Sequence, residues 1–140
     1  MSKRSRRSPI VLLHGLEQEV SSALSATLES LGYSVHIDDS HSSAHCITLA
    51  RHLRACALFC CSLPERYLEL LREPERDSGL PVIVVSRVPE VVQWLDALEA
   101  GASDYCAAPF ERRHVEWLME SARIRSRAAE PAALGSMAAA

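Results

Sequence analysis

Short apolar runs recur along the 140-residue chain and predict five buried β-strands. The clearest is Pro81–Ser86 (PVIVVS), which is apolar almost throughout, as in a strand that is covered on both faces of a sheet. The other four runs are Ile10–His14, Tyr33–Ile37, Cys56–Cys61 and Ser103–Cys106. Each run has the length of a strand rather than of a helix, so we expect a sheet of five strands.

Between these runs, apolar residues recur at the spacing of amphipathic helices and predict five of them. The expected inward positions are Val20, Leu24, Leu28 and Leu31; Ile47, Leu49, Ala50 and Leu53; Leu68 and Leu71; Val91, Leu95 and Leu98; and Val115, Leu118, Met119 and Ala122. Gly32 and Gly101 stand where the first and fourth helices would end, and Ser42 or Ser43 would cap the second. Strands that alternate with helices predict an α/β fold, doubly wound around a parallel sheet, with its chemistry at the carboxyl ends of the strands.

The composition is that of one soluble domain, since 48% of the residues are hydrophobic and suffice for a single core. No apolar run reaches the roughly 18 residues of a membrane span. No apolar segment of signal-peptide length follows the charged N-terminus. The five cysteines, at positions 46, 56, 60, 61 and 106, form no C-x-x-C pair, which favours reduced thiols over disulfides or a structural zinc site. We therefore expect a cytoplasmic protein without a membrane partner.

The net charge of −3 is unevenly distributed, because residues 1–8 are strongly basic. This segment holds Lys3, Arg4, Arg6 and Arg7. Cations without interleaved aromatic residues make a weak footprint for nucleic acid, so we expect a disordered tail and no nucleic-acid partner. Residues 127–140 are alanine-rich and predict a flexible C-terminal tail or linker. The segment after Arg125 is too short for a DNA-binding output domain, so the chain is expected to be a stand-alone regulator or the first part of a longer protein.

Ala97–Phe110 (ALEAGASDYCAAPF) is very similar to the pattern A-x-x-A-G-A-x-D-Y-x-x-K-P-F of receiver domains from bacterial two-component response regulators. Leu63-Pro64 matches the L-P that follows the phosphoacceptor strand of that family, and Ser86 matches the Ser or Thr that ends its fourth strand. The resemblance covers about residues 9–125. It implies a receiver-like domain over residues 9–126, with the flavodoxin-like strand order 2-1-3-4-5.

The resemblance also implies where a phosphorylation pocket would lie. Receivers hold Mg²⁺ with acidic residues after the first strand and phosphorylate an Asp at the end of the third. The corresponding residues here are Gly15 and Leu16 for the acidic pair, Cys60 for the phosphoacceptor, Ala108 for the lysine, Ser86 for the hydroxyl and Tyr105 for the switch aromatic. A shift of one residue places His14 and Gly15 at the acidic positions and still supplies no carboxylate. Because Mg²⁺ needs oxygen ligands and phosphoryl transfer needs offsetting cations, we expect no metal site, no cofactor and no enzymatic activity.

With this pocket degenerate, the resemblance implies an atypical receiver, or pseudo-receiver, that signals through protein–protein contact without phosphorylation. Receivers most often use the face formed by the fourth helix, the fifth strand and the fifth helix. Trp94 and Trp117 each precede an expected inward leucine on those two helices, so both should face outward and contribute to binding a partner or a second copy. The alternative is that each indole lies flat over the surface of the monomer.

Three other interpretations stay open from the sequence. Cys60 could be a redox-sensing thiol that forms a sulfenic acid, although free cysteines are more often small apolar core residues. A working phosphorylation pocket could be displaced from the positions named above. His41 and His45, with Cys46 adjacent, have the spacing of a helical metal pair, but surface histidines at a helix start explain this pattern more simply.

Overall fold

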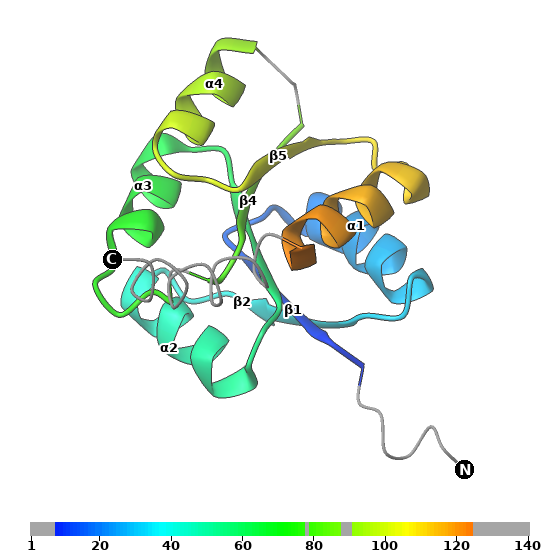
Figure 1. Cartoon of the computed structure of the whole chain (residues 1–140), viewed down its shortest axis with the longest axis horizontal. Coiled ribbons are helices and arrows are strands. Elements are labelled where there is room, and N and C mark those ends of the chain that lie inside the picture. Colours follow the sequence, from blue (N-terminus) through cyan, green and yellow to red (C-terminus); the bar gives the residue numbers. More distant parts are fainter. Residues whose placement is uncertain (1–7, 78, 88–90, 125–140) are drawn as a thin grey trace, which may run out of the picture.

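The five predicted strands form one parallel sheet in the computed structural model, which describes residues 8–77, 79–87 and 91–124 (Figure 1). The strands are β1 (Ile10–His14), β2 (Ser34–Asp38), β3 (Ala57–Cys61), β4 (Val82–Ser86) and β5 (Asp104–Ala107). They lie in the order β2-β1-β3-β4-β5, and every pairing is parallel. The prediction of a doubly wound sheet with the order 2-1-3-4-5 is therefore confirmed.

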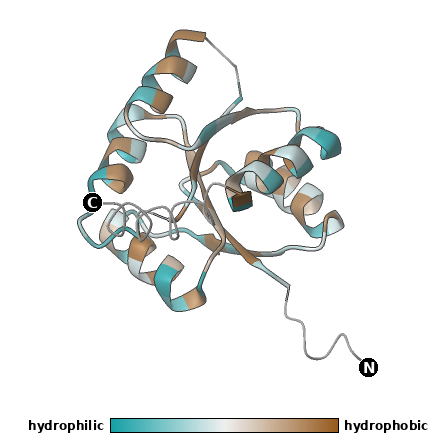
Figure 2. Ribbon diagram, in the orientation of Figure 1, coloured by the Kyte–Doolittle hydropathy of each residue, from teal (hydrophilic) through white to brown (hydrophobic). Residues whose placement is uncertain are grey.

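Helices cover both faces of this sheet, as the alternation of strands and helices predicts. They are α1 (Gln18–Ser30), α2 (Ser43–Leu53), α3 (Pro64–Arg72), α4 (Val91–Glu99) and a last helix over residues 112–124. α1 and the last helix, drawn in blue and orange, pack on one face, and α2, α3 and α4 pack on the other (Figure 1). Figure 2 shows the central strands in brown, so the most apolar layer lies between the two layers of helices.

Local sequence signals determine where several helices begin and end. The Ser42 hydroxyl accepts a hydrogen bond from the His45 amide at 3.0 Å, so Ser42 rather than Ser43 caps α2. Pro64 begins α3, where its missing N–H removes no helical hydrogen bond. After α1 the chain passes through Gly32, whose φ of 98° lies in the left-handed region that favours glycine.

The buried side of α3 differs from the prediction. The helix buries Tyr67 and Leu70, whereas the predicted Leu68 and Leu71 are only half-buried. These four apolar residues form two overlapping stripes on a helix of nine residues. The stripe that contains the tyrosine ring faces the sheet, because it buries the larger apolar area.

The prediction for α4 is wrong in a more consequential way. Leu95, expected to face the core, is 53% exposed, and Val91 is 65% exposed. Ala97 is the buried residue of this helix, and Leu98 is half-buried. Apolar residues surround most of α4, so their spacing does not identify the inward side. The last helix, in contrast, buries all four of its predicted residues.

Two strands lie one residue further along the chain than predicted. Tyr33 packs against the core beside α1, and β2 begins only after it and ends at Asp38. β5 likewise spans Asp104–Ala107. The shift of β2 matters for the site, because it places Asp38 in register with His14, the last residue of β1.

Residues 1–7 of the predicted basic tail and the whole predicted C-terminal tail, residues 127–140, lie outside the described residues. Among the helices of the described ranges, none combines the length and the apolar character that crossing a membrane requires. The described residues therefore belong to the layered domain between the two ends.

Candidate functional site

A pocket lies at the carboxyl edge of the sheet, where this topology usually carries chemistry. Its lining comes from the ends of β1, β3 and β4 and includes Gly15, Leu16, Cys61, Ser86 and Arg87. Three of the residues that sequence reasoning assigned to a pocket, Gly15, Leu16 and Ser86, thus come together here. Gly15 has a φ of 74°, and a Cβ added to it would lie 3.6 Å from the Cys61 sulfur. The loop after β1 therefore turns closely against the end of β3.

The predicted phosphoacceptor position, Cys60, does not line this pocket in the structure. Its side chain is 0% exposed and packs in the core between the sheet and helices α2 and α3. Cys61 is half-buried and lines the pocket instead. Adjacent residues of a strand point to opposite faces, so only one of the two thiols can reach the pocket.

The pKa values of the two thiols are shifted in opposite directions. The neighbouring Cys60 thiol lowers the pKa of Cys61, and the Leu63 amide and the charge of Arg66 add to this effect against that of burial. The Cys61 side chain, together with burial, raises the pKa of Cys60. The lowered pKa favours the thiolate form of Cys61, which is the form that reacts with oxidants. The sequence analysis instead named Cys60, one residue earlier, as the candidate redox-sensing thiol.

The lysine position of the family lies beside the pocket. Ala108 borders an adjoining pocket together with Pro109 and Arg87, and its amide donates to the Ser86 carbonyl at 2.9 Å. Arg87 lines both pockets and pairs with Glu17 at 2.8 Å. Both members of that ion pair are exposed, so it contributes little to stability. The cation that stands near the missing lysine is thus already engaged with a carboxylate.

The donor set of this pocket does not fit Mg²⁺, the ion that the resemblance to receivers implies. Among the described residues that line the pocket, Glu17 supplies the one carboxylate, and Arg87 occupies it. Gly15 and Leu16 offer no side-chain donor, and Cys61 offers sulfur, which Mg²⁺ does not favour. The described lining therefore supplies no unpaired carboxylate to hold the ion, and without the ion the charge of a transferred phosphoryl group is not offset.

The same edge of the sheet carries a row of buried side chains that sequence reasoning missed. The strand registers place Asp38, His14, Cys60, Val84 and Tyr105 side by side, one from each strand. All five are buried. Residues in register on parallel strands point to the same face, here the face that α2, α3 and α4 cover. The predicted second strand ends at Ile37, one residue before Asp38. With that strand extended to Asp38, an alignment of the strand ends identifies this row from the sequence.

His14 and Asp38 form the polar end of this row. The His14 Nδ1–H donates to Asp38 Oδ2 at 2.8 Å, and Ser40 donates to the same carboxylate from its amide at 3.2 Å and its hydroxyl at 3.1 Å. Burial acts to raise the pKa of Asp38, but the hydrogen bonds from Ser40 and His14 outweigh it and hold the pKa below the usual 3.8. The interior thus holds an ionised carboxylate with several donors around it.

Tyr105, the predicted switch aromatic, forms the other end of the row. It is 8% exposed, and its ring packs in the core cluster that includes Ala97 of α4. Its hydroxyl donates to Gln93 Oε1 at 3.5 Å. Packing against α4 and this contact set the orientation of the ring, which points inward.

α4 presents an apolar surface to solvent. Its four exposed apolar residues are between 44% and 69% exposed, and together they are called the α4 patch. The α4 patch consists of Val91, Val92, Trp94 and Leu95. On the last helix, Trp117 is 57% exposed and its ring stacks on His114 with 6.3 Å between the ring centres. The outward orientation expected for both tryptophans is confirmed.

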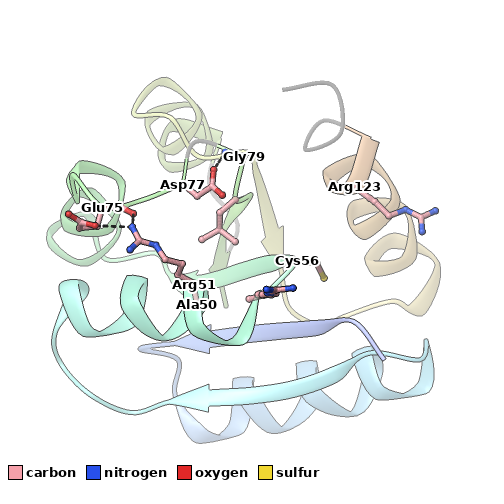
Figure 3. Close-up of a pocket in the computed structure, with 10 residues that line it drawn as sticks. Ala50, Arg51, Cys56, Glu75, Asp77, Gly79 and Arg123 are labelled. Atoms are coloured by element: carbon pink, nitrogen blue, oxygen red, sulfur yellow. Dashed lines mark hydrogen bonds and ion pairs between the residues drawn. The ribbon is translucent and has the colours of Figure 1, made fainter. Parts of the chain in front are cut away.

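A second pocket lies at the opposite, amino end of the strands (Figure 3). Arg51 of α2 binds Glu75 there at 2.8 Å, and Cys56 and Arg123 border the pocket as well. The ion pair is exposed on both sides, so it adds little stability. None of the sequence-predicted site residues lies in this pocket, which leaves the carboxyl edge as the candidate site.

Solved structures of other proteins share this architecture, although no protein-family model matches the chain. NtrX from Brucella abortus, in complex with ADP, aligns with a TM-score of 0.75 at 17% identity over 91% of this chain and 29% of the NtrX chain. The beryllofluoride-activated NtrC4 receiver domain dimer aligns with a TM-score of 0.68 at 20% identity, over 84% of this chain and 98% of that one. The Vibrio cholerae chemotaxis protein CheY4 aligns with a TM-score of 0.65 at 14% identity, over 81% and 98% of the two chains.

The chain therefore spans 29% of NtrX but corresponds to nearly the whole of the two receiver-sized proteins. Identities of 14% to 20% show a shared fold and leave the chemistry to be argued from the residues of the site. On the strand order, the two layers of helices and these alignments, the chain has the fold of response-regulator receiver domains.

Proposed function

We propose that this chain is an atypical receiver domain in a two-component type of signalling pathway and that it acts through protein–protein contact without phosphorylation. The changed pocket carries the proposal, since Gly15, Leu16 and Ala108 stand where receivers have carboxylates and a lysine. Burial of Cys60 removes the phosphoacceptor position from the pocket as well. A receiver fold that has lost this chemistry keeps its surfaces as the means of signalling.

The α4 patch supports the same function from the surface side. Contiguous exposed apolar side chains on a soluble domain are typical of surfaces that another protein covers. Trp94 of α4 and Trp117 of the last helix are both exposed and are of the residue type most enriched at binding hot spots. The partner proposed here is a second copy of the chain, bound through α4, β5 and the last helix. The NtrC4 receiver, whose fold this chain shares, is itself described as a dimer.

The test of the pocket is intact mass after incubation with acetyl phosphate and Mg²⁺. We expect no phosphoryl adduct, because the described lining of the pocket supplies neither the metal ligands nor the phosphoacceptor. A Mg²⁺ titration should likewise leave tryptophan fluorescence unchanged. A stable adduct, with saturable Mg²⁺ binding, would instead identify a working phospho-receiver whose pocket uses other positions.

Thiol-based redox sensing is a second candidate function, and the structure favours Cys61 over Cys60 for it. The Cys61 thiolate would attack hydrogen peroxide, take one oxygen to become a sulfenic acid, and release the other as hydroxide, which takes a proton from solvent to form water. A peroxide-treated sample beside the phosphorylation sample tests this by peptide mapping. We expect any added oxygen at Cys61, reversible by thiols and absent from Cys61→Ser. Oxidation at Cys60, or equal oxidation at the buried Cys106, would contradict the assignment.

For the surface, we expect the double variant Trp94→Ala, Trp117→Ala to weaken self-association by at least about 30-fold. Truncating a hot-spot aromatic residue costs about 2 kcal/mol of binding free energy. Both side chains are about half exposed, so the loss should fall on association rather than on folding. Sedimentation velocity over a range of protein concentrations measures the change.

The control for this variant is Ile37→Ala. Ile37 is 53% exposed on β2, at the edge of the sheet opposite β5, and its truncation should leave association unchanged. A wild-type chain that stays monomeric at all concentrations would remove the homodimer from the proposal. A double variant that associates as the wild type does would exclude this face as the interface.

A further inference from the structure

Three buried side chains with metal-binding atoms meet beside the carboxyl edge. His14 ends β1, Asp38 ends β2, and Cys46 lies in the first turn of α2. They are 1%, 4% and 0% exposed. One ligand atom from each, a ring nitrogen, a carboxylate oxygen and the Cys46 sulfur, lies within 4.8 Å of the other two. Three donors from three different elements thus surround a common point.

Neighbouring groups hold these donors in place. Ser40 donates two hydrogen bonds to the Asp38 carboxylate, at 3.2 Å and 3.1 Å, and so fixes its orientation. The Ser42 cap fixes the start of α2 and with it the position of Cys46. Outer contacts of this kind orient the ligands of metal sites and contribute to metal affinity.

A fourth donor lies at the rim of the cluster. His45 Nε2 is 3.9 Å from Asp38 Oδ1, and the His45 side chain is 59% exposed. Its ring can therefore turn toward the cluster without any repacking of the core. His41 is the other histidine that the helical spacing singles out. Its Nδ1 instead lies 3.4 Å from Nη2 of Arg66. His45 and Cys46 thus lie near His14 and Asp38, the last residues of β1 and β2, and do not form a pair with His41.

The charges of the cluster suit a divalent cation. A cation bound by one carboxylate and one thiolate forms a neutral centre, and a neutral centre costs less to bury than a lone carboxylate. A metal ion replaces the proton of a cysteine ligand, so Cys46 would bind the ion as a thiolate. Nitrogen, sulfur and oxygen donors in one set suit Zn²⁺, whereas Mg²⁺ and Ca²⁺ prefer oxygen alone.

We propose that this cluster is a tetrahedral Zn²⁺ site that ties α2 to the ends of β1 and β2. Its ligands are His14, Asp38, His45 and Cys46. On binding, the Cys46 thiol proton leaves to solvent, and the His14 proton moves from Nδ1 to Nε2 so that Nδ1 faces the ion. Four protein ligands close the coordination sphere, the arrangement of structural rather than catalytic zinc. The site does not depend on the signalling function proposed above.

The test is a titration of the reduced, metal-free full chain with Zn²⁺ in competition with a chromophoric chelator. We expect saturation at one ion per chain and a Zn²⁺-dependent rise in the melting temperature, because the ion binds only the folded state. Co²⁺ used in place of Zn²⁺ should give the visible bands of tetrahedral Co²⁺ and a thiolate charge-transfer band in the near ultraviolet.

Two pairs of variants locate the site. His45→Ala should bind Zn²⁺ about 10- to 100-fold more weakly. His52→Ala removes another exposed histidine of α2 and should bind as the wild type does. Cys46→Ser should lose the charge-transfer band, and Cys61→Ser, which removes the low-pKa thiol of the neighbouring pocket, should keep it.

Several results would overturn the proposal. They are the absence of saturable binding, a Co²⁺ spectrum without the thiolate band, equal affinities of His45→Ala and His52→Ala, and loss of the band in Cys61→Ser but not in Cys46→Ser. Circular dichroism establishes that each variant is folded before the titration. His45 is exposed, so His45→Ala keeps the test decisive even if Cys46→Ser fails to fold.

Discussion

Replacing Asp38 with alanine is expected to lower the free energy of unfolding by about 3 kcal/mol, because the variant leaves His14 buried without its acceptor. The carboxylate accepts from His14 Nδ1 at 2.8 Å and from the Ser40 hydroxyl at 3.1 Å. The His14 ring is 1% exposed and cannot turn to water for a new partner. Urea unfolding followed by circular dichroism, with a chelator present so that no bound metal contributes, measures the loss.

The matched control is Asp39→Ala, which removes an exposed carboxylate one residue along the chain and should change stability by less than about 0.5 kcal/mol. The pH dependence adds a second check. The folded-state pKa of Asp38 lies below its usual 3.8, so its contribution is fully present above that pH and is lost as the pH falls through the lower folded-state value. Equal losses in the two variants, or a difference that persists in strong acid, would contradict the expectation.

Cys60→Asp, which would restore the phosphoacceptor of a receiver, is expected to destabilise the fold by about 4 kcal/mol and to create no phosphorylation site. Cys60 is 0% exposed, and its register partner His14 already donates to Asp38. A new carboxylate would therefore be buried two strands away from that of Asp38, whose like charge adds to the cost of desolvation. Both effects favour the protonated form of the new side chain and raise its pKa in the folded state.

Cys61→Asp provides the comparison at the neighbouring position. Cys61 is half-buried, lines the pocket and lies near the positive charge of Arg66, so this variant should lose no more than about 1 kcal/mol. The raised folded-state pKa of the Asp in Cys60→Asp makes its penalty largest near neutral pH and smaller as the pH falls through that value. Urea unfolding at about pH 7 and about pH 5 separates the two variants. A Cys60→Asp chain that is as stable as the wild type and accepts phosphate would contradict the placement of Cys60.

The strands and most of the helices could be predicted because their pattern has a single interpretation. All five residues of β4 are buried, so its character does not depend on which face a residue occupies. α4 has no such pattern, because Val91 and Leu95 are exposed while the small Ala97 faces the sheet. Hydrophobic spacing assumes that the largest apolar residues face the core, and that assumption fails for a helix with an apolar outer surface.

The site divides in the same way. Gly15, Leu16 and Ser86 could be placed in one pocket because they follow strand ends that any parallel sheet brings to one edge. Which of Cys60 and Cys61 lines the pocket depends on the face to which each side chain points at the end of β3. A run of apolar residues does not reveal that face, because both positions are apolar. The contact between His14 and Asp38 joins residues 24 apart in sequence, and an error of one residue at the end of β2 conceals it.

The shallow burial of α4 also determines how this part of the molecule fluctuates. Because α4 buries Ala97 and only half-buries Leu98, little apolar surface would meet water if the helix separated from the sheet. Its amide hydrogens should therefore exchange with solvent through local opening, whereas those of the central strands β3 and β4 should exchange only when the whole domain unfolds. A partner that covers the α4 patch must slow exchange in this helix before it affects any other element. The surface proposed for signalling thus lies on a helix that can move while the sheet stays intact.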